Sequence, residues 1–265
     1  MIKKISIFLV ILTTVNSCKH YLPGYDYELF KDTPVYQLAK AVESDDLLKI
    51  NHLVKEEKMK VNYREPKFGN NLLMLAIVNQ KEETVKTLLD LGADPNLKNT
   101  YSNDTALTVA IQYMESCNLD KIKLLVAHGA DVNTEKFNKQ EMLKDSIYHT
   151  YHVTVLKLAA SKKSCINLVK YLVDKGANIN LYASYEGDGG ITSALIHNNL
   201  DVALYLIKHP STKIPDVVYI RDQGGENEQK LSITDMLEEE NYSSDPKKQK
   251  YKEEILSYLK SIDKR

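Results

Sequence analysis

The sequence predicts an all-α repeat protein, a solenoid of stacked helix-turn-helix units joined by short hairpin loops. Two observations carry this prediction. One pattern recurs four times along the chain at a spacing close to 33 residues, roughly the period of a known class of helical repeat, and three of the four copies end in nearly the same turn. A single helix pair cannot bury its apolar face alone, so such a chain is stabilised by stacking neighbours into one continuous core.

The recurring turns follow the second helix of each predicted unit and begin with a glycine. They are Gly92-Ala93-Asp94-Pro95-Asn96, Gly129-Ala130-Asp131-Val132-Asn133 and Gly176-Ala177-Asn178-Ile179-Asn180. Glycine ends a helix in the left-handed conformation at little cost, and the following Asp or Asn accepts a hydrogen bond from its own backbone. The sequence therefore places a helix end at each of these three glycines.

A small residue occupies a fixed place in the first helix of each unit, where a larger side chain would hold the two helices beyond packing distance. These residues are Ala76, Ala110, Ala159 and Ala194, separated by 34, 49 and 35 residues. The longer second gap predicts an insertion at 134–151, and Met142, Leu143 and Ile147 within it indicate a short amphipathic helix.

These turns and helix patterns resemble the ankyrin repeat family. The resemblance covers Thr33 to Asn180 well and the rest of the chain more loosely. It implies one repeat domain over residues 33–265, with about six repeats of which the first and last are degenerate polar caps. No copy has the full Thr-Pro-Leu-His start of the family, since the histidine place holds Met74, Thr108, Lys157 and Thr192.

Residues 1–17 have the layout of a secretory signal peptide, with two lysines followed by an apolar run that is too short to span a bilayer well. The sequence from Val15 to Cys18 resembles the bacterial lipobox, which implies cleavage before Cys18 and attachment of palmitate or a similar acyl chain there. An ordinary signal peptide with an incidental cysteine is the alternative. Lys19 favours the outer membrane, facing the periplasm, and residues 18–32 predict a tether.

Composition sets limits on the partner. The net charge is -1 for the whole chain, and without residues 1–17, which hold two lysines and no acidic residue, it is -3. No basic excess indicates nucleic-acid binding. Cys117 and Cys165 fall in the links between helices, and since stacked helices lie about 8 to 10 Å apart, we expect two separate half-buried thiols. A disulfide is the alternative, if the links bend in an oxidising periplasm.

The sequence contains no complete catalytic, metal or cofactor site. His149 and His152, with Asp145 nearby, are the best candidates for a metal site, but surface or packing roles for these histidines are favoured. The glycine-rich segments around Asp188 and at Gly224-Gly225 predict hairpin tips. We therefore expect no enzyme activity, no cofactor and no small-molecule substrate.

The ankyrin resemblance implies that a protein partner binds to the hairpin tips and to the concave face of the first helices. Aromatic residues, which are enriched in binding hot spots, recur in the tips, although packing within a hairpin is the alternative for any one of them. The tip candidates are Tyr63, Phe68, Tyr101, Tyr148, Tyr151, Tyr182 and Tyr185. The first-helix candidates are Val78, Asn79, Gln112, Tyr113, Lys162, Ile196 and His197.

The leading hypothesis is a non-catalytic, membrane-tethered module that binds an unidentified protein in the bacterial cell envelope. A more specific form is an inhibitor or immunity protein that blocks a toxin, as the resemblance to bacterial ankyrin lipoproteins implies. Two alternatives stay open. One is a metal-handling or enzymatic protein that uses the insertion, and the other is a structural envelope spacer.

Overall fold

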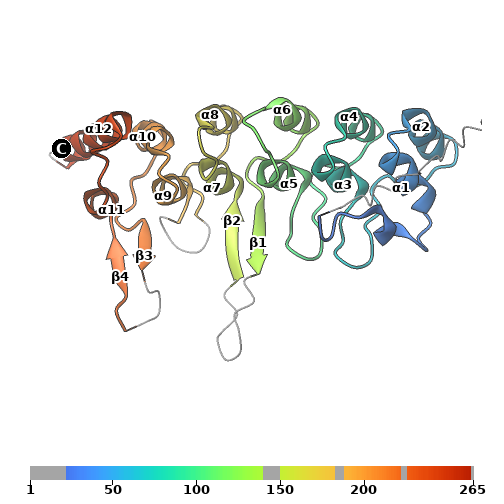
Figure 1. Ribbon diagram of the computed structural model, residues 1–265, viewed down its shortest axis with the longest axis horizontal. Helices are drawn as coiled ribbons and strands as arrows, with labels where there is room; N and C mark the ends of the chain where they lie inside the picture. Colours follow the sequence, from blue (N-terminus) through green and yellow to red (C-terminus); the bar gives the residue numbers. More distant parts are fainter. Residues whose placement is uncertain (1–21, 140–149, 183–187, 222–225, 264–265) are drawn as a thin grey trace, which may run out of the picture.

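The computed structural model describes residues 22–139, 150–182, 188–221 and 226–263. Helices pair in order along this part of the chain (Figure 1). The first helices of the pairs are α1 (Tyr36–Glu43), α3 (Leu72–Val78), α5 (Ala106–Gln112), α7 (Val155–Ala160), α9 (Gly190–Ile196) and α11 (Ile233–Glu239). The second helices are α2 (Leu47–Lys55), α4 (Glu82–Asp90), α6 (Asp120–Ala127), α8 (Ile166–Asp174), α10 (Leu200–Lys208) and α12 (Pro246–Ile262). The predicted all-α repeat solenoid is confirmed.

The core lies between two rows of helices. The first helices form one row and the second helices form the other (Figure 1), and each first helix packs on its neighbours in the row, for example α5 on α3 and α7. All four of the regularly spaced alanines are buried. The first helices α3, α5 and α9 are buried along almost their whole length, and the second helices, which are polar on their outer faces, cover that row. Within the described ranges, no helix combines the length and apolar character needed to cross a membrane.

The glycine turns have the predicted conformation. Gly92, Gly129 and Gly176 have φ angles of 88°, 87° and 92°, the left-handed region in which glycine is favoured. Asp94 accepts a hydrogen bond from the backbone N–H of Asn96 at 2.8 Å, and the other two turns repeat this bond. Each turn is thus closed by its own side chain, as its sequence predicts.

The asparagine that ends each turn has a second role, because it joins one repeat to the next. Asn96 Nδ2 donates to the carbonyl of Gly129 at 2.8 Å, and its Oδ1 accepts from the backbone N–H of Asp131 at 2.7 Å. We call such a pair of bonds an asparagine clamp. The residues that form clamps are Asn62, Asn96, Asn133 and Asn180.

Two antiparallel hairpins extend from the first-helix row (Figure 1). In one, β1 (Glu135–Lys139) pairs with β2 (Thr150–Thr154), so β1 and the start of β2 lie within the predicted insertion. In the other, β3 (Tyr219–Arg221) pairs with β4 (Gln229–Leu231), as the glycines between them predict. The predicted amphipathic helix around Met142, Leu143 and Ile147, and the glycines themselves, lie outside the described residues.

Residues 22–32, which fall within the predicted tether, pack against the first repeats. The 3-10 helix η1 (Tyr27–Phe30) contacts α1, and the side chains of Tyr27 and Phe30 are fully buried. Asn70 Nδ2 donates to the carbonyl of Gly24 at 2.8 Å. The rings of Tyr27 and Phe30 join the apolar core beside α1, so this part of the predicted tether is folded onto the repeats.

A disulfide joins Cys117, between α5 and α6, to Cys165, at the start of α8. The prediction of two separate thiols is wrong. It used the spacing of helix axes, whereas the two links bend toward each other beyond the helix ends and bring the Cα atoms to 5.5 Å. This lies within the range that a disulfide requires.

Candidate functional site

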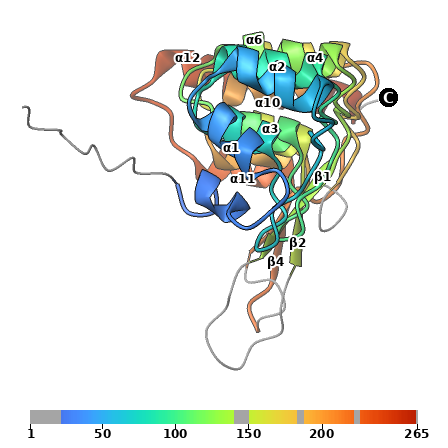
Figure 2. The ribbon, with the colours of Figure 1, turned by 90° about the vertical axis from the view of Figure 1, so that its right-hand side faces the viewer.

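The concave face is bounded by the first-helix row and by the hairpins that extend from it. Seen along the array in Figure 2, the helices and hairpins form an angle, and the blue N-terminal segment lies inside that angle beneath α1. Four equivalent positions, three residues after each core alanine, follow one another along this face. They are Asn79, Tyr113, Lys162 and His197.

The chain's own N-terminal segment covers the first two of these positions. Asn79 Nδ2 donates to the carbonyl of Tyr25 at 3.2 Å, and the ring of Tyr25 meets that of Tyr113 edge to face, with centroids 5.4 Å apart. Val78 is buried in the same region. Burial, with Tyr113 and Asp104 nearby, raises the pKa of the Tyr25 phenol, which stays neutral. This part of the groove is therefore occupied from within.

A pocket of about 310 Å³ opens between the N-terminal segment and the hairpin tips of the second and third repeats. Its aromatic walls are Tyr25, Phe68, Tyr101 and Tyr113. Phe68 and Tyr101 meet edge to face with centroids 5.8 Å apart, and Tyr101 is 55% exposed. Ligand pockets typically measure about 300 to 1,000 Å³ and combine apolar walls with a few fixed polar groups. The pocket is large enough for one ring system.

Buried polar groups hold the pocket in shape. Asp104 accepts hydrogen bonds from Lys136 Nζ at 3.0 Å and from Thr108 Oγ1 at 2.9 Å, and Lys136 Nζ also donates to Gln112 Oε1. Asp104 and Lys136 are both largely buried where they line the pocket, so the two opposite charges compensate each other with little exposure to water. A second buried bond joins Asn99 Nδ2 to Asn70 Oδ1 at 2.9 Å. These bonds fix the lining before any partner arrives.

Lys162 lies directly beside this pocket. Its Nζ donates to the backbone carbonyl of Gln112 at 2.7 Å, and no carboxylate of the described chain pairs with it. Burial lowers the pKa of Lys162. The half-buried ammonium thus has one carbonyl acceptor and no compensating negative charge in the part of the chain that the structure describes.

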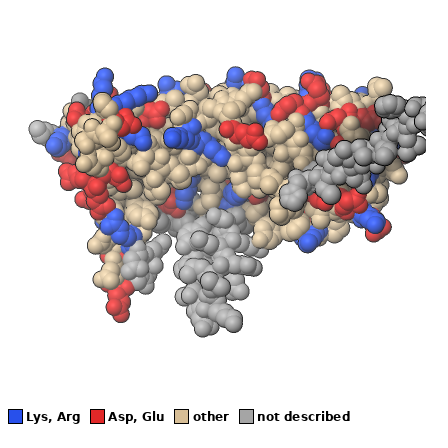
Figure 3. Space-filling model, viewed as in Figure 1, with Lys and Arg blue, Asp and Glu red and all other residues tan. Residues whose placement is uncertain are grey.

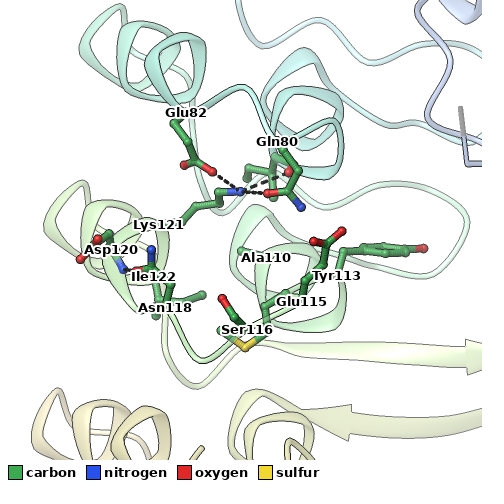
Figure 4. A pocket seen from close by; sticks show the side chains of 12 residues that line it. Gln80, Glu82, Ala110, Tyr113, Glu115, Ser116, Asn118, Asp120, Lys121 and Ile122 are labelled. Carbon is green, nitrogen blue, oxygen red and sulfur yellow. Dashed lines mark hydrogen bonds and ion pairs between the residues drawn. The ribbon is translucent and has the colours of Figure 1, made fainter. Parts of the chain in front are cut away.

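Lys121 shows what a compensated lysine looks like in the same array (Figure 4). It also reaches the previous repeat, donating to the Ile77 carbonyl at 3.4 Å, but Glu82 pairs with it at 2.8 Å and Gln80 Oε1 accepts from it at 2.9 Å. The surrounding cavity measures about 160 Å³, and the ring of Tyr113 points away from Lys121. The bonds of Lys121 in this cavity therefore join two successive repeats.

Beyond Lys162, the described part of the chain leaves Ile196 and His197 exposed in the groove. Ile196 is 47% exposed, and the His197 ring bonds through Nδ1 to the Ser193 carbonyl at 2.8 Å. Acidic and basic side chains are interspersed over the face of the array shown in Figure 3.

The remaining candidates have structural roles or lie outside the described residues. Tyr63 packs beside Phe30 with centroids 6.5 Å apart, and Tyr182 donates from its hydroxyl to the Lys213 carbonyl at 3.4 Å. Tyr151 is on β2, where only its backbone is described. Those outside the described residues are Cys18, Tyr148 and Tyr185.

The metal hypothesis gains little from the described residues. His152 Nδ1 lies 3.3 Å from Glu135 Oε2 across the hairpin, whereas Asp145 and His149 are outside the described ranges. Within those ranges, no group of three or more potential ligands is placed to hold a metal ion.

Tyr25, Asp104 and Lys136 line the pocket but are not among the residues that the sequence predicts for the site. Tyr25 falls within the predicted tether, and Asp104 and Lys136 lie just before and just after a repeat pattern. Asp104 stands immediately before Thr105, the N-cap of α5, and this position is the one sequence signal that indicates a role for it. The pairing with Lys136 depends on the array bringing two successive tips together.

Comparisons with known proteins agree with the repeat architecture. Residues 38–136 match a family model of ankyrin repeats in three copies, and residues 156–207 match one of ankyrin repeats in many copies. The chain is 28% identical over 163 residues to putative ankyrin repeat protein L86 of Acanthamoeba polyphaga mimivirus, which covers 56% of the chain and 27% of the relative.

Two further relatives are similar over comparable lengths. A transient receptor potential cation channel subfamily A member 1 homolog of Caenorhabditis elegans is 32% identical over 135 residues, 51% of the chain and 10% of the relative. Putative ankyrin repeat protein FPV216 of fowlpox virus is 29% identical over 147 residues, 55% of the chain and 44% of the relative. The chain thus spans less than half the length of each of these relatives.

Proposed function

Because the chain belongs to the ankyrin repeat family, whose repeats generally bind protein partners, we propose that it is a non-catalytic module that captures another protein in its concave groove. The observation that carries this proposal is the preformed aromatic pocket beside Lys162. An aromatic pocket with buried, satisfied polar groups is suited to accept an anchor side chain with little reorganisation.

We further propose that the module is tethered in a bacterial envelope through acyl chains on Cys18. The sequence from Val15 to Cys18 supports lipidation there. The disulfide between Cys117 and Cys165 supports an oxidising compartment, since disulfides persist outside the reducing cytosol. Both features fit the outer membrane with the repeats in the periplasm.

An inhibitor or immunity role against a toxin is the more specific form of this proposal. A rigid groove with a preformed pocket is suited to cover a surface of a partner and block it, because few groups have to be ordered on binding. Co-expression with a toxin encoded nearby tests this role. Survival that depends on the intact groove supports it, and equal survival without this protein contradicts it.

Capture from an envelope extract tests the binding role. The chain carrying Cys18→Ser is immobilised, and retained proteins are identified by mass spectrometry beside a Tyr101→Ala variant. Leu48→Ala is the matched control, because Leu48 is 86% exposed on the other row of helices. We expect a protein that the parent and Leu48→Ala retain and Tyr101→Ala loses. Equal retention by all three chains contradicts the proposal.

Metabolic labelling tests the anchor separately. Cells expressing the chain are given an alkyne analogue of palmitate, and incorporation is compared with a Cys18→Ser variant. We expect label only in the parent, recovered with membranes. Label that persists in Cys18→Ser, or a parent chain that takes up none, contradicts lipidation at this residue.

A further inference from the structure

The aromatic pocket and Lys162 form one continuous site, because both contact Gln112. The Gln112 side chain lines the pocket and accepts from Lys136, and its backbone carbonyl accepts from Lys162. A group that enters the pocket between Tyr101 and Tyr113 is therefore followed, along the groove, by the Lys162 ammonium.

The charges around this site favour a negatively charged partner. Inside the pocket, Asp104 and Lys136 neutralise each other. At the rim, Lys67 Nζ lies 5.0 Å from the Phe68 ring centroid, and Lys162 stands at the opposite end. No carboxylate of the described chain forms an ion pair with either lysine, but the buried Glu65 carboxylate accepts from the backbone N–H groups of Lys67 and Phe68. The uncompensated positive charge of this site is therefore that of Lys162.

We propose that this site binds a protein segment in which an aromatic side chain enters the pocket and a neighbouring Asp or Glu pairs with Lys162. This proposal rests on the protein-binding function above and names the chemistry of the partner. A carboxylate would supply the acceptor that the half-buried ammonium lacks, and a charge-assisted bond of this kind is stronger than a neutral one. A basic segment would be repelled from the same place.

The size of the pocket limits the anchor to a single ring system. At about 310 Å³ it is at the lower end of ligand pockets, and two edge-to-face ring pairs, Phe68–Tyr101 and Tyr25–Tyr113, form its aromatic walls. Aromatic anchors bind well in such places because they bring a large contact area with few rotatable bonds.

Selection from a random peptide library tests the proposed chemistry. Twelve-residue peptides displayed on phage are selected on the full chain carrying Cys18→Ser, and the recovered peptides are sequenced and synthesised. Their affinities are then measured by fluorescence anisotropy on Lys162→Met, Lys162→Arg and Tyr101→Ala. Lys123→Met is the matched control, because Lys123 is exposed on α6 in the other row of helices.

We expect recovered peptides to share an aromatic residue with Asp or Glu close by. Lys162→Met and Tyr101→Ala should each weaken their binding about 10-fold or more, as for loss of a charge-assisted bond or a hot-spot ring. Lys162→Arg should retain most of the affinity, and Lys123→Met all of it. Raising the salt concentration should weaken binding to the parent more than to Lys162→Met.

Other outcomes separate the two proposals. Peptides that need Tyr101 but carry basic residues, or that bind Lys162→Met as tightly as the parent, overturn the acidic chemistry and leave the binding function intact. Peptides that bind all the variants equally, or no enrichment on a chain whose circular dichroism shows it to be folded, overturn both. Lys162→Met is expected to fold normally, because methionine preserves the side-chain stem without a buried charge.

Discussion

The two halves of the groove use equivalent helix positions in opposite ways. In the first half, Asn79 and Tyr113 are engaged by the chain's own Tyr25. In the second half, the hydrogen bonds that the described chain offers to these side chains are to backbone carbonyls. Lys162 bonds to Gln112 of the preceding repeat, and His197 bonds to Ser193 of its own helix. The comparison shows that a repeat position acquires its role from what covers it. The N-terminal segment around Tyr25 forms one wall of a pocket in the first half of the groove, whereas Ile196 and His197 stay exposed in the second half of the described chain.

The difference follows from the ends of the array. A terminal repeat lacks a neighbour on one side and needs another way to cover its apolar surface. Tyr27 and Phe30 supply that cover at the N-terminal end, and the polar helix α12 closes the other end. Since the covering segment enters the groove at the first repeats, it is that half which the described residues narrow.

The largest expected effect tests whether the N-terminal segment is part of the folded core. Phe30 is fully buried, so Phe30→Ala should lower the free energy of unfolding by about 3 to 5 kcal/mol, the usual loss for a buried ring. Ile196→Ala, at a 47% exposed site in the open half, should cost less than about 1 kcal/mol. Urea denaturation measures both, and similar losses would remove the contrast between the halves.

The disulfide should have the next largest effect, because it joins the third repeat to the fourth, where the covered half meets the open half. The bond closes a loop with a sequence separation of 48 residues. Replacing both Cys117 and Cys165 by serine should therefore lower stability by about 2 to 4 kcal/mol. Thermal unfolding of the oxidised chain and of the double variant measures the loss, and an unchanged midpoint would show that the bond adds no stability.

The asparagine clamps should give a smaller effect that is the same in both halves. Asn62→Ala and Asn133→Ala each remove two bonds to the next turn, for a loss of about 1 to 2 kcal/mol. Asn167→Ala, at an exposed position of α8, is the control and should cost nothing measurable. Urea denaturation measures these losses. Clearly different losses for Asn62→Ala and Asn133→Ala would contradict the expectation that the clamps contribute equally in both halves.

The smallest effect concerns the charge on Lys162. Its pKa is lowered in the folded chain, so between that value and the ordinary lysine pKa the unfolded chain binds more protons, and stability rises with pH. Below both values the buried charge opposes folding. Lys162→Met should therefore be slightly more stable at pH 7, by less than about 1 kcal/mol, and lose this rise. If the stabilities of the parent and of Lys162→Met changed in parallel from pH 7 to 10, the lowered pKa of Lys162 would be contradicted.

The sequence predicted what the repeat period encodes and missed what depends on distant segments meeting. The glycine turns, the buried alanines and the groove positions from Asn79 to His197 follow from local patterns that recur. The docking of Tyr25 on residues more than 50 positions away does not, because nothing in a segment of mixed polar and aromatic residues identifies its target. The Asp104–Lys136 pair and the disulfide likewise join successive repeats through loops, whose paths the helical period does not determine.

The docked N-terminal segment also sets a length. Four chain steps separate Cys18 from Leu22, where the described structure begins, and a fully extended chain of that size spans roughly 14 Å. With acyl chains on Cys18, as we propose, the first repeats would be held almost against the headgroups of the membrane. The protein would then search for its partner in a thin layer at the bilayer surface, and partners confined to that layer would encounter it at a far higher effective concentration than partners free in solution.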